Sequence, residues 1–222
     1  YNYQKGMKEI IQELKYFLKR KDIGTDSDRA LLLDFQATLE IKPEKAIKLE
    51  KDALAQIENI TADNARLVSN LHANLGGLYR MNGHPDLARE HMEKSISLLD
   101  QFNLLHINDS IPQIANYAMF LTEQQEPERG ISELQKLSGI IKEYHSDDCL
   151  DYAKVQETLG TIYLMTANLP QAKTHFKRAF KIYEKIWADE PEMIEAKYQE
   201  IQELYPQIGF CIGKNLSGLL TK

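Results

Sequence analysis

The chain has 222 residues and a formal net charge of −6, with 43% hydrophobic and 27% charged residues. A chain of this length buries enough surface to fold without disulfides or a structural metal, and its interspersed charges leave no basic stripe for a nucleic-acid backbone. No apolar run is long enough to span a membrane, no signal peptide is visible, and Cys149 and Cys211 lie in no metal or redox spacing. We therefore expect a cytoplasmic protein that has no cofactor and contacts neither membrane nor nucleic acid directly.

Helix-forming residues dominate the composition, and proline and glycine are sparse, which predicts an all-α fold. The first expected helix covers residues 3–20, and Gly24 ends it in a left-handed conformation. Thr25, Asp26 or Ser27 then offers a side-chain oxygen that caps the next helix. The later helices are expected at about 27–40, 43–59, 64–81, 85–101, 111–124, 127–144, 149–167, 169–188 and 191–204.

A 42-residue repeat governs most of the chain. The segment 74–79 (NLGGLY) returns as 158–163 (TLGTIY), and a degenerate copy (NYAMFL) lies halfway between them at 116–121. Two antiparallel helices approach closely only where one of them offers a small residue. Steps of 42 place such a residue in the second helix of each pair, at Ala46, Ala88, Gly130 and Ala172. Each pair leaves an apolar face that the next pair covers, so the pairs are expected to stack into a solenoid.

The pattern Leu-Gly-x-x-Tyr followed by Gly-x-x-x-x-Ala-x-x-x-Phe/Met resembles the tetratricopeptide repeat. The 42-residue period and the sequence AFKIYEK at 179–185 most resemble the long repeats of kinesin light chain, and similar repeats occur in many bacterial proteins. The resemblance is weaker in the first repeat, where Asp34, Ala37 and Glu50 replace the usual Gly, Tyr and aromatic residue. It implies a right-handed α-α superhelical solenoid of antiparallel helix pairs.

The resemblance also divides the chain into segments. Residues 1–22 form an N-terminal helix that is a cap or the second half of a preceding pair. The repeats cover 27–205, at about 27–60, 64–101, 111–144 and 149–188, with a final half-repeat at 191–205. The apolar tail 206–222 either caps the last pair or docks in a groove as a built-in ligand. Because the chain begins at Tyr1 rather than Met, we expect upstream sequence to have been removed.

The resemblance implies that the concave surface, lined by the first helix of each pair, recognises a peptide or protein. The groove residues carried over to this chain are Asn70, Asn74, Gly77, Arg80, Asn116, Met119, Lys154, Glu157 and Thr161. Asn74 and Asn116 occupy the position at which ligand-binding members place an asparagine to hold an extended peptide backbone; otherwise they are exposed helix asparagines. Arg80 and Lys154 either bind a carboxylate of the ligand or are solvated charges.

The sequence shows no catalytic constellation. Its six histidines form no His-Glu-x-x-His motif, none lies near a Cys-x-x-Cys pair, and no Gly-x-Ser-x-Gly motif occurs. His91 and His175 occupy corresponding positions beside the packing residues Met92 and Phe176, which indicates a structural role. We expect no catalytic residue and no metal site.

Two functions remain as hypotheses. The first is an adaptor that recruits a segment of a partner protein in its concave groove. The second is the peptide-sensing region of a bacterial signalling or transcriptional regulator. The domain that precedes Tyr1 would distinguish them, because a DNA-binding domain there favours the sensor. A homodimer is an assembly that the sequence allows.

Overall fold

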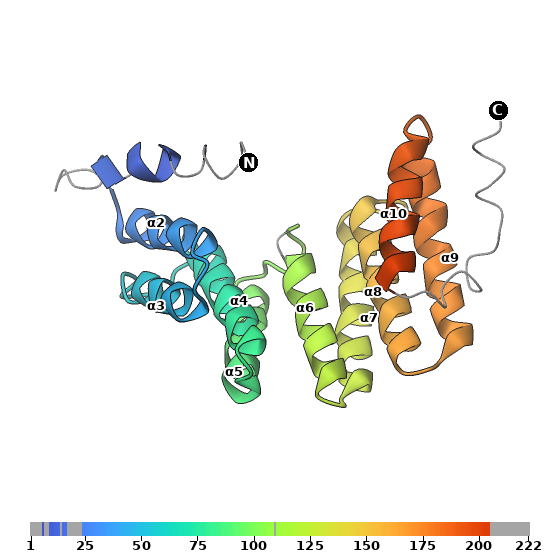
Figure 1. Ribbon diagram of the computed structural model, residues 1–222, viewed down its shortest axis with the longest axis horizontal. Helices are drawn as coiled ribbons and strands as arrows, with labels where there is room; N and C mark the ends of the chain where they lie inside the picture. The colour runs from blue at the N-terminus through green and yellow to red at the C-terminus, as the bar shows by residue number, and fades with distance from the viewer. Residues whose placement is uncertain (1–5, 7–8, 14, 17–23, 109, 205–222) are drawn as a thin grey trace. The chain divides into compact units, whose positions relative to one another are not determined.

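The structure is a computed structural model that describes residues 6, 9–13, 15, 16, 24–108 and 110–204 (Figure 1). All regular structure in these ranges is helical. The described residues before position 17 are helical, as expected, while the rest of the predicted N-terminal helix lies outside the described residues, and so does the tail 206–222. No described helix is long and apolar enough to cross a membrane.

The helices agree with the predicted ones to within a few residues. They are α2 (Asp26–Thr38), α3 (Pro43–Leu54), α4 (Ala65–Met81), α5 (Pro85–Gln101), α6 (Ser110–Glu123), α7 (Pro127–Tyr144), α8 (Leu150–Met165), α9 (Leu169–Ile186) and α10 (Pro191–Leu204). The largest difference is the shorter α3, which the sequence predicted to extend to about residue 59. Prolines at the first or second position of α3, α5, α7 and α9 fix the dihedral angle φ where no backbone donor is needed.

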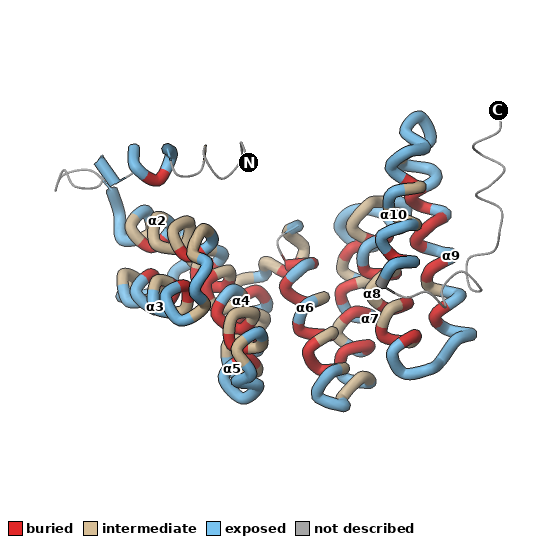
Figure 2. The backbone as a smooth tube through the Cα atoms, in the orientation of Figure 1, coloured by how far each residue is buried: buried red, intermediate tan, exposed pale blue. Residues whose placement is uncertain are grey.

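The helices belong to two compact units, residues 1–113 and 114–222. In the first unit α2 packs on α3, α3 on α4, and α4 on α5; in the second α7 packs on α8, α8 on α9, and α9 on α10. Figure 2 shows the buried residues on the helix faces that meet within these pairs. Consecutive helices therefore pair within each unit.

Small residues set how closely the paired helices approach. A Cβ added at Gly76 would lie 2.6 Å from the Met92 side chain, and one at Gly160 would lie 2.9 Å from the Phe176 ring. At Gly130 the added atom would lie 2.6 Å from a backbone oxygen of α6. The four small residues predicted in the second helices are all buried. The predicted 42-residue register is therefore confirmed by packing.

The ends of the helices follow the same period. Thr25 is the predicted cap that α2 uses: its hydroxyl accepts from the Asp28 N–H at 3.2 Å, and the Asp28 carboxylate accepts from the Thr25 N–H at 2.6 Å. The turn that joins α4 to α5 contains Gly83 at φ 73°. The same position in the next two repeats holds Gln125 at φ 65° and Ala167 at φ 58°. The backbone conformation thus repeats even where the glycine does not.

Candidate functional site

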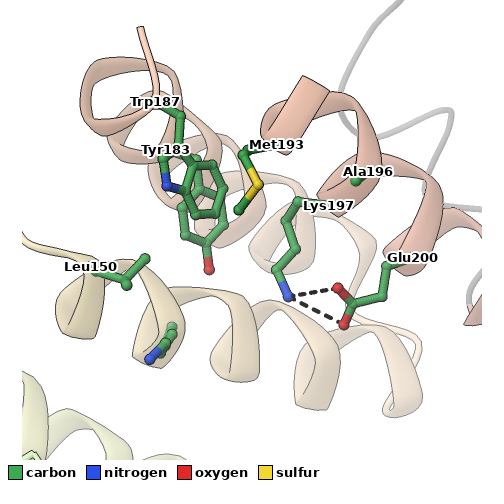
Figure 3. A pocket seen from close by; sticks show the side chains of 8 residues that line it. Leu150, Tyr183, Trp187, Met193, Ala196, Lys197 and Glu200 are labelled. Carbon is green, nitrogen blue, oxygen red and sulfur yellow. Dashed lines mark hydrogen bonds and ion pairs between the residues drawn. The ribbon is translucent and has the colours of Figure 1, made fainter. Parts of the chain in front are cut away.

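A pocket of about 260 Å³ lies in the second unit, between α8, α9 and α10 (Figure 3). Its lining residues are Leu150, Lys154, Tyr183, Trp187, Met193, Ala196, Lys197 and Glu200. The first two come from α8, Tyr183 from α9, and the last four from α10, while Trp187 is the residue that caps the C-terminus of α9. The pocket is thus surrounded by α8 and α10, each the first helix of its repeat, and by the C-terminal end of α9, the second helix of the pair that α8 begins.

Two aromatic rings form one wall of this pocket. The ring of Tyr183 is fully buried and stacks on Trp187, with centroids 4.8 Å apart and planes 11° from parallel. Phe180 meets Tyr183 edge to face at 5.8 Å, and the backbone N–H of Trp187 donates to the carbonyl of Tyr183 at 2.8 Å. Met193, 42% exposed, faces the same space from α10 (Figure 3). The wall is therefore held rigidly by packing and offers an apolar surface to a ligand.

A polar network lies beside the aromatic wall. The Tyr183 hydroxyl donates to Glu157 Oε2 at 2.6 Å, and Lys197 Nζ lies 3.0 Å from Glu157 Oε1. Lys197 also contacts Glu200 at 3.1 Å, as Figure 3 shows. Burial, and then the Glu157 carboxylate, raise the pKa of Tyr183 above its usual range, so its hydroxyl remains a donor. The network fixes α10 to α8 and orients the Tyr183 ring.

The same network favours the protonated, charged form of Lys197. Burial lowers the pKa of Lys197, but the Glu157 and Glu200 carboxylates outweigh it and raise the pKa overall. Lys154 is held less firmly, since its Nζ is 3.8 Å from Asp151 and its side chain is 54% exposed. Lys154 is therefore the cation at the pocket that is most accessible to a ligand.

The predicted groove residues are divided between the two units. In the second unit Lys154 lines the pocket and Glu157 holds its wall, while Thr161 lies half-buried further along α8. Asn116 is exposed and Met119 half-buried on α6. The structure thus brings only two of these five residues to one site.

The predicted residues of the first unit make internal contacts. Asn70 Oδ1 accepts from Gln113 Nε2 at 2.5 Å, and Asn74 Nδ2 donates to Asp34 Oδ1 at 2.8 Å and to Glu50 Oε1 at 3.2 Å. Gly77 and Arg80 are half-buried on α4, and Arg80 is engaged in an interaction of its own. The amide group of Asn74 is therefore already bound to carboxyl groups of its own fold.

Known proteins resemble this chain both in sequence and in fold. Residues 110–185 match the model of the tetratricopeptide repeat. This segment therefore has the sequence pattern of tetratricopeptide repeats. No curated protein matches the sequence. The crystal structure of BtubC (BKLC) from P. vanneervenii has a TM-score of 0.67 at 19% identity, covering 82% of this chain and 72% of that one.

Two further similar structures are crystal structures of a putative kinesin light chain from Podosopora anserina with nearly identical tetratricopeptide-like repeats. One of them, a variant with a single substitution, has a TM-score of 0.67 at 14% identity and covers 84% of this chain and 92% of that one. The other has a TM-score of 0.65 at 14% identity and covers 83% and 92%. These similarities support the all-helical solenoid fold of tetratricopeptide repeats, which are generally scaffolds without catalysis.

Most of the residues that line the pocket were not predicted from the sequence. Tyr183 was noted only as part of the repeat motif at 179–185, and neither Trp187 nor Met193 was predicted as a site residue. The sequence feature that could have indicated the pocket is Trp187, the single tryptophan of the chain, at the end of its most regular repeat. Among the described residues no group of three or more His, Cys, Asp or Glu side chains is arranged to hold a metal ion.

Proposed function

We propose that this protein is an adaptor that binds a segment of a partner protein, and that an apolar side chain of the segment occupies the pocket between α8, α9 and α10. The observation that carries this proposal is the apolar lining formed by the half-buried Trp187 and the exposed Met193 beside an accessible lysine, Lys154. Interfaces concentrate binding energy in such aromatic-lined pockets, which an anchoring side chain fills.

The test is to fill the pocket without disturbing the core. Ala196 is an exposed residue of α10 that lines the pocket, so Ala196→Arg places a long side chain in it. Gln202 is an exposed residue of the same helix outside the pocket, and Gln202→Arg is the matched control with the same added charge. Both variants and the wild type serve as baits for proteins of the source organism, read by mass spectrometry.

We expect a partner that wild type and Gln202→Arg retain and Ala196→Arg loses. A synthetic peptide covering the captured segment is then titrated while the fluorescence of Trp187, the only tryptophan, is followed. A saturable change in emission with wild type, absent with Ala196→Arg, would support the pocket as the binding site. Identical capture by both variants would refute it and would move recognition to another surface.

A further inference from the structure

Four lysines form a row along the exposed side of α9. They recur at every fourth position, at Lys173, Lys177, Lys181 and Lys185, and all four are exposed. Residues four apart lie on the same side of a helix, about 6 Å from one another along its axis, so the row is roughly 18 Å long. We refer to these four residues as the lysine row. The interspersed charges of the sequence led us to expect no basic stripe, and the row on α9 corrects that expectation.

The repeat architecture does not require the lysine row. The buried residues of α9 are alanine, isoleucine and aromatic side chains, none of them in the row. Two repeats earlier, the corresponding positions of α5 hold Arg89, Glu93, Ser97 and Gln101. There the first two form an ion pair at 3.9 Å and the other two are uncharged. One repeat earlier, in α7, none of the four positions holds a basic residue. The row is therefore a property of α9 and not of the fold.

The lysine row is also unfavourable for the helix that carries it. Like charges four residues apart on a helix repel each other, and the row contains three such pairs. Lys185 is paired with Asp148, but the other three lysines form no ion pair within the described part of the chain. Glu184 is the single acid in the sequence of α9, and Arg178 adds a fifth basic side chain. The repulsion is thus not offset inside the protein, whereas an anionic partner would offset it.

The residues around the row distinguish between classes of anionic partner. A helix that lies on a membrane has large apolar side chains beside its basic ones, but every exposed position of α9 between Pro170 and Ile186 is polar. Proteins that bind single-stranded nucleic acid stack bases on aromatic side chains, and no aromatic residue of α9 is exposed. The net charge of −6 also repels a long polyanion, whereas a short acidic segment contacts the row alone.

We propose that the lysine row binds a short acidic segment of a partner protein. In an extended segment, side chains two residues apart point to the same side at a spacing of about 6.6 Å, which is close to the spacing of the lysines. Alternate acidic residues of the segment can therefore each approach one lysine. The flexible lysine stem and the three donors of its ammonium group accommodate the small difference in spacing. The row shares no residue with the pocket between α8, α9 and α10, so this surface goes beyond the proposed function.

The test uses a fluorescein-labelled peptide of five Glu-Gly units, with five Gln-Gly units as its uncharged counterpart. The whole protein is titrated into each peptide at low salt, and binding is followed by fluorescence anisotropy. We expect saturable binding of the acidic peptide only, which weakens as sodium chloride is raised because salt screens exposed charges. A labelled thymidine hexamer, which has five phosphates, tests nucleic acid. Tighter binding of this hexamer, or cosedimentation with phosphatidylserine vesicles at the same salt, would overturn the proposal.

Two double variants with the same net charge locate the binding surface. Lys173→Glu with Lys181→Glu converts all three like-charge pairs of the row into opposite-charge pairs, so α9 should be at least as stable as in the wild type. Lys42→Glu with Lys45→Glu changes two exposed lysines at the start of α3, where acids are favourable.

We expect the α9 variant to bind the acidic peptide at least about tenfold more weakly and to melt no lower than the wild type, while the α3 variant binds within about twofold of the wild type. Equal weakening in both variants would show that only net charge matters and would overturn the proposal, as would wild-type affinity in the α9 variant. The measurement involves no residue of the pocket, so its outcome is separate from that of the proposed function.

Discussion

At the scale of single residues, Ala167 lies in a turn where its backbone is in the left-handed conformation, which is unfavourable for alanine. Ala167 adopts φ 58°, whereas Gly83 holds the same position at φ 73°. Left-handed backbone costs an L-residue roughly 1–2 kcal/mol, while glycine adopts it freely.

We expect Ala167→Gly to stabilise the protein by about 0.5–1 kcal/mol, because the relief of strain exceeds the added entropy of the unfolded chain. Gly83→Ala should destabilise it by about 1 kcal/mol, since no side chain lies within 4 Å of the added Cβ and only the backbone conformation opposes it. Urea unfolding measures both. Ala196→Gly, inside α10, is the control and should be destabilising by about 1 kcal/mol. Equal losses at positions 167 and 196 would contradict the assignment.

A histidine pair provides a second test at this scale. His72 and His91 contact through their Nδ1 atoms at 2.9 Å, and His91 stacks on Tyr79 at 5.4 Å. The second unit repeats the arrangement with Gln156, whose Oε1 contacts His175 Nδ1 at 2.9 Å. The structural role predicted for these histidines is thus reflected in equivalent contacts in both units.

Burial, and then the neighbouring His91 and Lys94, lower the pKa of His72 to about 4. In the unfolded chain His72 binds a proton near pH 6.5, whereas in the folded chain it stays neutral down to about pH 4. The contribution of the neutral, buried His72 to the free energy of unfolding is therefore fully present above pH 6.5 and is lost as the pH falls toward 4. His72→Gln installs the Gln156 arrangement and should flatten the pH dependence in that window. Urea unfolding at pH 7, 5.5 and 4.5 measures it, and parallel slopes for wild type and variant would exclude the mechanism.

At the scale of the helix pair, the packing of α8 on α9 is the most direct test of the repeat register. Ala172 is fully buried at the crossing of these helices. Ala172→Asp buries an unpaired carboxylate and should cost at least about 3 kcal/mol. Thermal melting measures the loss, and Lys173→Asp at the adjacent exposed position is the control. A wild-type melting temperature for Ala172→Asp would mean that the register is wrong.

At the scale of the whole molecule, each repeat of a solenoid contacts mainly its neighbours, so stability is distributed along the chain. Trp187 reports on the second unit alone, whereas circular dichroism reports on all helices. Ala46, 2% exposed, occupies in α3 the position that Ala172 occupies in α9.

We therefore expect Ala46→Asp to lower the denaturation midpoint seen by circular dichroism more than the midpoint seen by Trp187 fluorescence. Ala172→Asp should lower the Trp187 midpoint strongly. Both variants introduce the same carboxylate at equivalent positions, so each is the control for the other. Equal shifts of both midpoints in both variants would show that the chain unfolds as one cooperative body.

The sequence by itself determined the helices, their pairing and the 42-residue register, because caps, prolines, small residues and apolar periodicity act over a few residues and are visible locally. It also indicated that His91 and His175 serve the fold. Only the tertiary structure decided which side chains meet. Asn74 was predicted as a groove residue, but its amide group is bound by Asp34 and Glu50, which come from two other helices. The pocket at Trp187 likewise depends on how α8, α9 and α10 converge, since contacts between distant segments follow from packing and leave no local pattern in the sequence.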